Sequence, residues 1–166
     1  MVKKIILVFI FPLYAFAANV EVAFSPGQTS LNLVLKTITS ARKSICMATY
    51  SFTQPDVAKA LVNAKNRGIA VMVVSDYDAN KNKYTATRYL ANNGVSVRLN
   101  NHYAIMHNKF IVVDNQTVET GSFNYSQAAV RKNAENVIVF WDNPDIASQY
   151  SNECNRLFNE AFPLAN

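Results

Sequence analysis

The sequence places a histidine and a lysine two residues apart, at His107 and Lys109, at the start of a strand-forming stretch. Side chains two positions apart on a strand point to the same face, so we expect the imidazole and the ammonium to be neighbours. An unprotonated imidazole is a nitrogen nucleophile, and a lysine supplies a positive charge. The pair therefore suits an attack on an anionic centre such as the phosphorus of a phosphodiester.

A second polar pair, Ser122 and Asn124, ends the next strand-forming run, and the residues 114–117 between the two runs have the composition of a hairpin turn. If Asp114 pairs with Thr117 across that turn, Lys109 lies opposite Ser122 and His107 lies opposite Asn124. Directly opposed side chains have Cβ atoms about 5 Å apart. The register therefore predicts one polar cluster in which His107 attacks a phosphate that is held by Lys109, Ser122 and Asn124.

Asp114 lies five residues after Lys109, which turns its side chain to the other face of an uninterrupted strand. We therefore assign Asp114 to structure rather than to chemistry. A lone histidine and lysine on an exposed strand usually mean nothing. Six fixed identities at fixed spacing, however, would coincide by chance on the order of once in 10^5 or less.

With these residues the chain resembles the phospholipase D superfamily, whose signature H-x-K-x4-D-x6-G-S-x-N it carries in full from His107 to Asn124. Its small size, exported start and single copy of the motif make it similar to the small bacterial EDTA-resistant endonucleases of that superfamily. The resemblance spans the whole chain after its first residues. The motif specifies the chemistry strongly and the substrate weakly.

The resemblance implies that His107 forms a covalent phosphohistidine and that a second motif histidine activates the water that releases it, with no metal or other cofactor. Since the chain has one motif, it further implies a homodimer with a shared active site. Glu135 resembles the acidic residue that orients the nucleophilic histidine in the family. Its position after Lys132-Asn133-Ala134 is equally typical of a solvated loop charge.

We therefore expect a metal-independent endonuclease that hydrolyses DNA with little sequence preference, with RNA left open as a substrate. One alternative is a phospholipid phosphodiesterase, which predicts an apolar rim near the site. A non-catalytic DNA-binding protein is the other, and it leaves the motif unexplained. The sequence does not distinguish DNA from RNA or lipid, nor does it reveal the cleavage polarity or the biological role.

The elements that position this cluster read as one α/β domain of 166 residues, half of them hydrophobic. The rhythm of apolar runs predicts a mixed, mostly parallel central β-sheet with helices on both faces. Expected strands are 20–24, 45–50, 70–74, 95–99, 109–113, 118–122 and 136–141. Expected helices are 31–41, 55–66, 84–92 and 144–158.

The first residues resemble a secretory signal peptide, because Lys3 and Lys4 precede an apolar run that ends in Ala15-Phe16-Ala17. We expect cleavage after residue 17, which leaves residues 18–166 as a nuclease domain that is periplasmic or secreted, without stable membrane association. The alternative is an uncleaved anchor, but the run is shorter than the roughly 20 residues that span a bilayer. Cleavage lowers the formal charge by two, from +5 to +3, so the domain is only mildly basic.

Several other residues permit more than one interpretation. Cys46 and Cys154 either join in the oxidising compartment or stay separate thiols. We expect His102 to be a loop histidine rather than a zinc ligand, and Asp76 and Asp78 to cap or turn the chain rather than bind magnesium. Some basic residues either track a nucleic-acid backbone or are simply solvated, namely Lys81, Lys83, Arg88, Arg131 and Lys132.

Overall fold

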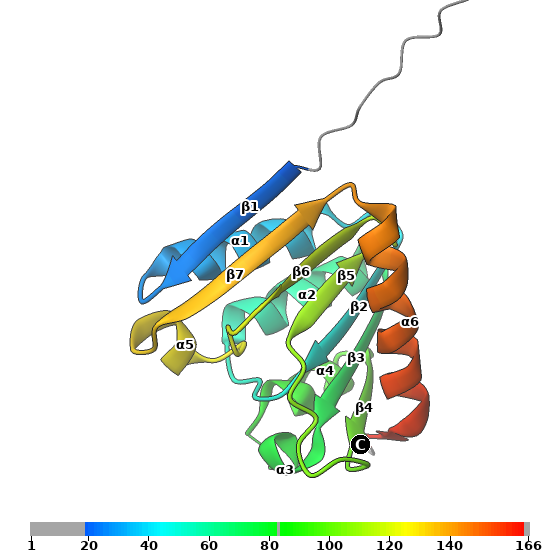
Figure 1. The fold of residues 1–166 in the computed structure, drawn as a ribbon. Coiled ribbons are helices and arrows are strands. Elements are labelled where there is room, and N and C mark those ends of the chain that lie inside the picture. The colour runs from blue at the N-terminus through cyan, green and yellow to red at the C-terminus, as the bar shows by residue number, and fades with distance from the viewer. Residues whose placement is uncertain (1–18, 83, 165–166) are drawn as a thin grey trace, which may run out of the picture.

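A single mixed sheet organises the chain in the computed structural model, which describes residues 19–82 and 84–164 (Figure 1). Within those residues eight strands lie in the order β1-β7-β6-β5-β2-β3-β4-β8. The strands are β1 Asn19–Ser25, β2 Ser44–Thr49, β3 Ala70–Asp76, β4 Ser96–Asn100, β5 Phe110–Val113, β6 Thr117–Gly121, β7 Glu135–Trp141 and β8 Phe162–Pro163. The helices are α1 Gln28–Ser40, α2 Pro55–Asn66, α3 Tyr77–Asn80, α4 Ala86–Asn92, α5 Gln127–Arg131 and α6 Pro144–Glu160.

The strands run mostly antiparallel, so the prediction of a mostly parallel sheet is wrong. Only β2 with β3 and β3 with β4 are parallel among the pairs within the described residues. Those strands are joined by helical crossovers, as parallel neighbours require. From β5 onward the chain forms hairpin-like neighbours, and β1 joins β7 in the antiparallel sense. The helical rhythm of the first hundred residues therefore does not extend to the whole sheet.

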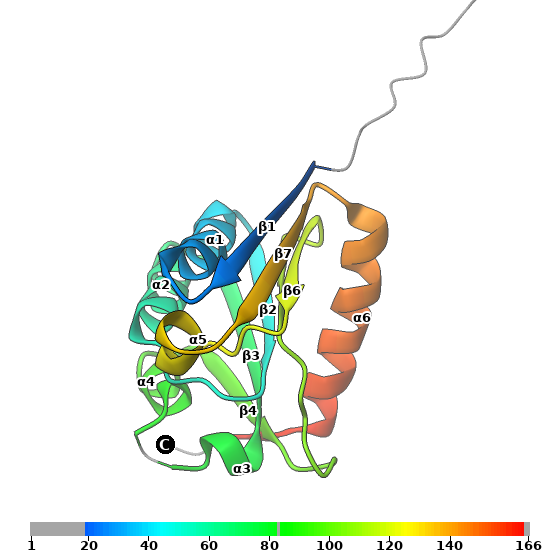
Figure 2. The same cartoon turned by 60° about the vertical axis from the view of Figure 1, so that its left-hand side comes forward.

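Helices cover both faces of the sheet, as predicted. On one face α1, α2, α4 and α5 lie together, whereas α6 lies on the other face (Figure 2). The alternation along β5 divides its side chains between the two cores: Ile111 and Val113 pack with the first group of helices, and Phe110 and Val112 pack under α6. All four residues are buried. This central strand is thus held rigidly from both sides, and it carries the residues that precede it into a fixed position.

The predicted elements are present, with ends that shift by a few residues. Three short elements were not predicted: α3, α5 and β8. The start of α5 has a signal in the sequence, because Ser126 accepts a hydrogen bond from the backbone N–H of Ala129 at 3.2 Å and so caps the helix. The predicted signal peptide, residues 1–17, lies outside the described residues.

A disulfide joins Cys46 of β2 to Cys154 of α6, which settles the alternative that the sequence leaves open. The two residues are 108 positions apart in the chain, and their Cα atoms are 6.4 Å apart. Cys154 is fully buried, with Leu157 and Phe158 of the same helix in the core beneath α6. The bond therefore anchors α6 covalently to the centre of the sheet.

Candidate active site

His107 is exposed at the end of a loop that leads into β5, and the residue before it anchors that loop. The backbone N–H of Met106 donates to a carboxylate oxygen of Asp76 at 2.9 Å, and the Met106 side chain is buried. The other oxygen of Asp76 accepts from Ala79 N–H at 2.9 Å and caps α3. This confirms the capping function expected of Asp76, which also fixes the chain where His107 begins.

Tyr50 joins His107 and Lys109 into one cluster. Its ring centroid lies 4.8 Å from that of the His107 imidazole, and Lys109 Nζ lies 5.5 Å from the same ring centroid. Lys109 Nζ also donates to the backbone carbonyl of His107 at 2.7 Å. The predicted adjacency of imidazole and ammonium is therefore present, although it is a backbone carbonyl that links them.

Sequence reasoning did not identify Tyr50, yet the sheet register explains its position. Ala48 of β2 lies opposite Phe110 of β5, and continuing this antiparallel register by two residues places Tyr50 opposite Asn108. The chain that leaves β2 therefore runs beside the segment of His107 and Lys109, and the Tyr50 ring contacts both side chains. The backbone carbonyl of Tyr50 accepts a hydrogen bond from the Asn80 side chain, so α3 holds the tyrosine in place.

Lys109 is a buried cation, with 7% of the residue exposed. Burial lowers the pKa of Lys109 below its ordinary value, and the nearby Glu135 carboxylate partly offsets this by favouring the charged form. Its backbone carbonyl accepts from the Thr120 hydroxyl at 3.0 Å, which fixes it against β6. An ammonium in such a place attracts a phosphate more strongly than a solvated one does, because less water screens it.

Ser122 and Glu135 form a second part of the cluster. The Ser122 hydroxyl donates to one Glu135 oxygen at 2.6 Å and accepts from Asn136 N–H at 3.0 Å. The Asn133 side chain donates to the other Glu135 oxygen at 2.9 Å. Glu135 is thus held at the start of β7 and acts electrostatically on Lys109. Its orientation of His107 stays a prediction, since the contacts described for this carboxylate are with Ser122 and Asn133.

Gly121 makes the close approach of Ser122 to β7 possible. Its φ is +153°, and a Cβ at this position would lie 2.2 Å from the backbone oxygen of Asn136. Only glycine accommodates both the conformation and the contact. The motif glycine therefore lets the chain leave β6 so that Ser122 N–H reaches the same Asn136 oxygen at 3.1 Å.

The predicted register of the hairpin is wrong by one residue. Val113 lies opposite Thr117 and Phe110 opposite Thr120, so Asp114 does not pair with Thr117. The turn takes up an extra residue because Asp114 and Asn115 both have a φ of 54°, and Gln116 N–H closes it onto the Val113 carbonyl at 2.9 Å. The pairing of Lys109 with Ser122, and of His107 with Asn124, therefore does not occur.

Asn124 lies beyond the last pair of the hairpin, in the segment that leads to α5. It is half-buried, and its side-chain oxygen is buried without a hydrogen-bond partner among the residues that the structure describes. Its backbone carbonyl accepts from Ser126 N–H at 2.6 Å. The segment is held through its neighbour, because the Tyr125 carbonyl accepts from both Thr53 and Gln54 N–H at 2.9 Å.

Asp114 lies at the far end of β5 from Lys109, and its contacts are structural. Its carboxylate accepts from the backbone N–H groups of Arg42, Lys43 and Ser44 at 2.9, 2.7 and 2.8 Å. Burial alone would raise the pKa of Asp114, but these three hydrogen bonds and the charge of Lys43 hold it below its usual value. The residue thus fastens the hairpin turn to the start of β2. It lies beyond the end of β5 with a φ of 54°, so the parity argument, which assumed an uninterrupted strand, does not apply to it.

The other residues that the sequence offered as candidates lie apart from this cluster or make other contacts. The His102 ring centroid lies 5.1 Å from that of Tyr103, and the backbone N–H of His102 donates to the side-chain oxygen of Asn100 at 2.9 Å. Lys81 pairs with Asp78 at 2.7 Å, and Lys83 lies outside the described residues. In residues 19–82 and 84–164, no three His, Cys, Asp or Glu side chains come together as a metal site would require. The same part of the chain contains no helix with the length and apolar character of a membrane span.

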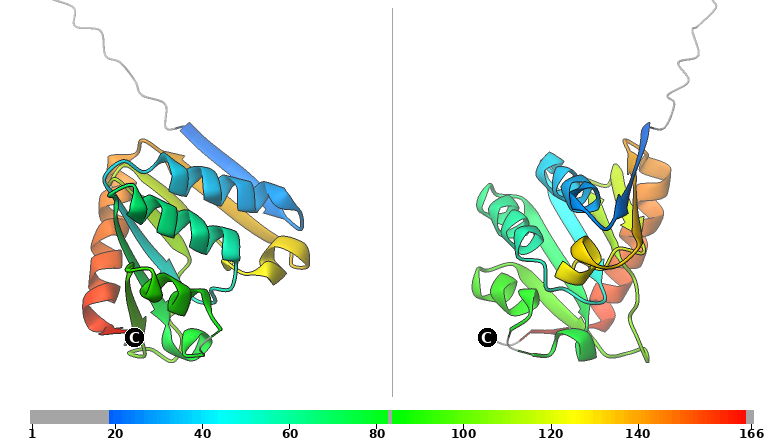
Figure 3. Two further views of the ribbon diagram at one scale, coloured as in Figure 1. Left: turned by 180° about the vertical axis from the view of Figure 1, so that it is seen from behind. Right: turned by 90° about the vertical axis from the view of Figure 1, so that its left-hand side faces the viewer.

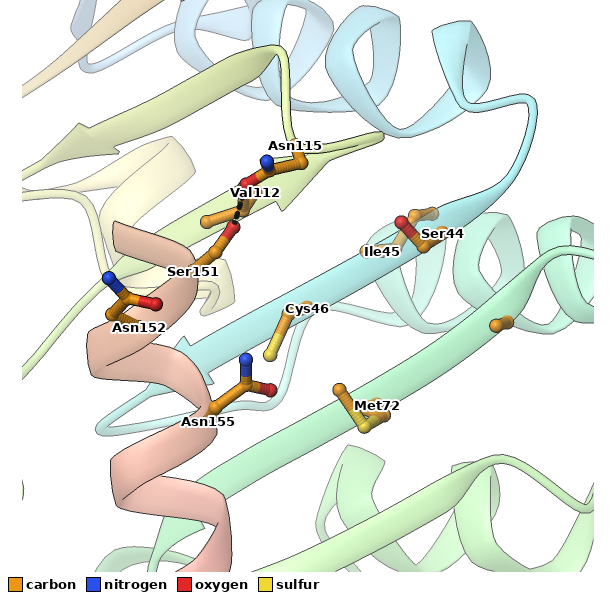
Figure 4. Close-up of a pocket in the computed structure, with 10 residues that line it drawn as sticks. Ser44, Ile45, Cys46, Met72, Val112, Asn115, Ser151, Asn152 and Asn155 are labelled. Atoms are coloured by element: carbon orange, nitrogen blue, oxygen red, sulfur yellow. Dashed lines mark hydrogen bonds between the residues drawn. The ribbon is translucent and has the colours of Figure 1, made fainter. Parts of the chain in front are cut away.

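Two hollows in the described residues lie at the end of β5 away from His107. One of about 390 Å³ lies between α6 and the strands β2, β3 and β5, where Ser151 donates to Asn115 at 2.6 Å and Cys46 and Met72 line the floor (Figure 4). The other, of about 620 Å³, surrounds Asp114 and Trp141. Asn115 and Asp114 belong to the hairpin turn, so both hollows are at the far end of β5. The first is lined by neutral side chains, which offer no acid or base for catalysis.

Comparisons with known proteins agree with this geometry. Residues 34–158 match the family model described as "Cardiolipin synthase, PLD-like domain". The structure is similar to Nuc, a phospholipase D family member from Salmonella typhimurium, with a TM-score of 0.87, 41% identity, and coverage of 90% of this chain and all of that one. NucT from Helicobacter pylori is similar at a TM-score of 0.76 and 28% identity, covering 88% of this chain and all of that one. A Rickettsia conorii protein named phospholipase D is 33% identical over 84% of this chain and 70% of its own length.

Proposed function

We propose that this chain, which belongs to the phospholipase D superfamily of phosphodiesterases, is an endonuclease that hydrolyses DNA with little sequence preference through a covalent phosphohistidine. The observation that carries the proposal is the meeting of an exposed imidazole, His107, with a buried ammonium, Lys109, beside the Ser122–Glu135 pair. Similarity to Nuc and NucT, which extends over the whole of each of those chains, supports the choice of nucleic acid.

In the proposed first step, one nitrogen of His107 attacks phosphorus, and the bond from phosphorus to the leaving ester oxygen breaks as the P–N bond forms. Lys109 neutralises charge on the non-bridging oxygens, and Ser122 and Asn124 donate to them. Asn124 lies two residues after Ser122 in the half-buried segment that follows β6, and its amide N–H groups are the donors proposed here. In the second step water attacks phosphorus, the P–N bond breaks, and His107 is restored.

Each step also needs a proton moved, first to the leaving oxygen and then from the attacking water. One His107 cannot serve as nucleophile and acid together, and His102, the other histidine of the chain, packs against Tyr103 instead. We therefore propose that the His107 of a second copy supplies this acid and base in a symmetric dimer. Each copy would then contribute half of one shared site.

An uncovered apolar surface supports the dimer. Strand β1 is an edge of the sheet, and its Val20, Val22 and Phe24 are 43%, 60% and 64% exposed. They alternate along one face of the strand, opposite to the buried Ala23, which packs in the core beneath α1. Strand β1 itself lies at the side of the sheet away from α6 (Figure 2). Phe24 lies opposite Asn136, next to Glu135. A second copy that covers this strip would therefore reach the edge of the active site.

Light scattering on the chain that lacks residues 1–17 tests the dimer, with Val22→Lys as the variant that disrupts the strip. We expect a dimer for the parent chain and an inactive monomer for the variant. A parent chain that is monomeric and fully active would refute the shared site. The matched control is Asn19→Lys on the same strand, which is also exposed and lies at the opposite parity.

An assay with plasmid DNA, RNA and phosphatidylcholine vesicles in the presence of EDTA tests the substrate. We expect DNA cleavage that the chelator does not abolish. Lipid release without DNA cleavage would instead favour a phospholipase, an outcome that the name of the Rickettsia relative and the exposed Ile105, two residues before His107, make worth measuring. Loss of DNA cleavage in EDTA would contradict the phosphohistidine mechanism.

We also propose that the protein acts in the periplasm or outside the cell. The Cys46–Cys154 disulfide supports this location, because such bonds persist in oxidising compartments. The lysine pair and apolar run at the start of the sequence support export. Fractionation of cells that produce the full chain, followed by mass determination of the product, tests both export and cleavage after residue 17.

A further inference from the structure

Two tyrosines are exposed on the face of the sheet that α1, α2, α4 and α5 cover, in a place that the proposed chemistry does not use. Tyr84 is 87% exposed just before α4, and Tyr89 is 43% exposed within α4. Helices α2 and α4 lie side by side on this face (Figure 3). The exposure of large aromatic rings to water is unfavourable in free energy, and such rings often mark a binding surface.

A hollow of about 200 Å³ separates the two rings from α2. Tyr84, Tyr89 and the aliphatic part of Ala58 and Ala86 line it, together with the polar Thr53 and Thr85 and the exposed Lys59. Pockets for drug-sized ligands measure roughly 300–1,000 Å³. The hollow is smaller than these and suits one planar ring with a polar edge. Thr53, Tyr84 and Thr85 also line a second hollow of about 680 Å³, together with Lys81.

One short loop connects this hollow to the active site. Tyr50 contacts His107 and Lys109, and Thr53, three residues later, lines the hollow. Three residues span at most about 11 Å. The loop is fixed along its length, because Phe52 pairs with Tyr125, and Thr53 N–H donates to the Tyr125 carbonyl at 2.9 Å. A ligand in the hollow is therefore within a few nucleotides of a phosphate at His107.

From this arrangement we infer that Tyr84 and Tyr89 form a stacking subsite for a base of single-stranded nucleic acid, and that Lys59 attracts an adjacent phosphate. The inference rests on the proposed nuclease function and deepens it, because it names the form of the substrate. In a single strand a base is free to stack on these rings, whereas in a duplex it is paired and stacked on its neighbours. Tyrosine rings stack on any base, which agrees with low sequence preference. Beside the tyrosines, the wall combines the small apolar Pro55, Ala58 and Ala86 with the polar Thr53 and Thr85, so it offers a base both an apolar face and a polar edge.

Binding is measured by fluorescence anisotropy with the dimeric His107→Asn chain, so that the probe stays intact. The probes are labelled oligothymidylate and an oligonucleotide of equal length and charge whose central nucleotides are abasic. We expect the parent to bind oligothymidylate at least about tenfold more tightly than the abasic probe. The double variant Tyr84→Ala, Tyr89→Ala should lose that preference, whereas Tyr84→Phe, Tyr89→Phe should keep it because the rings remain.

The Lys59→Ala variant separates charge from stacking. We expect it to reduce the slope of log K against log salt by about 0.7 while the preference for bases over abasic sites remains. Both tyrosines are exposed, so the alanine variants should fold, which a thermal melt checks. A double alanine variant that melts like the parent and still prefers oligothymidylate would overturn the subsite.

Two further measurements separate this inference from its alternatives. Vesicles of phosphatidylglycerol test a lipid surface: binding that is lost in the double alanine variant, with oligothymidylate affinity unchanged, would overturn the nucleic-acid assignment. Turnover of bis(4-nitrophenyl) phosphate by the unsubstituted chain tests the phosphodiesterase chemistry by itself. Failure of that turnover would count against the proposed function, while the anisotropy comparison would still decide the subsite.

Discussion

The Tyr125 hydroxyl donates a 2.5 Å hydrogen bond to the carboxylate of Glu119, and both side chains are fully buried. The Tyr125 ring also packs edge-on against Phe52 and Phe123. Through its backbone carbonyl, Tyr125 holds the segment that follows Tyr50. This buried pair therefore ties the chain that carries Ser122 and Asn124 to the loop that carries Tyr50.

Glu119 makes the stability of the fold sensitive to pH. Burial raises the pKa of Glu119 to about 8, although the Tyr125 hydrogen bond opposes the rise. The native state then keeps a proton that the unfolded chain releases above its ordinary pKa of 4.5. The free energy of unfolding should therefore fall as the pH rises from about 4.5 to about 8, and little further above that.

Urea unfolding of the oxidised chain at about pH 5 and about pH 8.5 measures this dependence. In Glu119→Gln the side chain stays neutral and can still accept from Tyr125, so the loss of stability between the two pH values should be smaller. An equal loss in parent and variant would show that Glu119 does not titrate in this range.

Replacing His107 by Asn should abolish turnover without unfolding the protein, because the side chain is exposed and is assigned only to the chemistry, as nucleophile in one copy and as acid and base in the other. We expect a fall in kcat of at least about 10³-fold, measured on plasmid DNA. His102→Asn is the matched control, since it changes the other histidine of the chain and should keep activity. Equal losses of kcat in the two variants would show that His107 is not the nucleophile.

Lys109→Met should separate catalysis from stability. Methionine fills similar space but lacks the charge, so kcat should fall by about 10²-fold to 10³-fold. The melting temperature should stay level or rise, because a buried ammonium no longer loses its hydration on folding. A variant that keeps full activity would mean that another cation neutralises the phosphate.

Gly121→Ala should destabilise the protein by more than about 2 kcal/mol, since the new methyl group meets the Asn136 backbone and φ is positive. It should also separate Ser122 from Glu135 and lower activity. Gly68→Ala is the control: its φ of +89° carries strain, but nothing lies within 4 Å of the added carbon. Urea unfolding measures both variants. Similar losses in their free energies of unfolding would show that the positive φ, and not the contact with Asn136, is the cause.

Reduction of the disulfide should lower the free energy of unfolding by about 2–5 kcal/mol, because the bond closes a long loop between Cys46 and Cys154. Unfolding with and without dithiothreitol measures this. The double variant Cys46→Ala, Cys154→Ala should behave like the reduced parent and should not respond to the reagent. A reduced chain as stable as the oxidised one would show that packing of α6 suffices.

Local patterns predicted the elements of the fold well, because β5 and the helices carry periodic apolar residues. They failed where pairing decides the outcome: the direction of β1 and β7 depends on distant partners, and the register of β5 with β6 depends on two residues with positive φ, Asp114 and Asn115. Spacing sufficed to predict that His107 and Lys109 are neighbours. Tyr50 could not be identified, since its position follows from the pairing of β2 with β5, in which Ala48 lies opposite Phe110, 62 residues later in the sequence.

The anchoring of Asp114 on the start of β2 gives the hairpin one fixed end, and its other end carries Lys109. The four residues Phe110–Val113 thus act as a spacer of set length between a fastened turn and the reacting groups. One residue more or less in that spacer would turn Lys109 to the opposite side of the sheet. Length changes are therefore far better tolerated at Asn115 and Gln116, outside the spacer, than anywhere between Lys109 and Asp114.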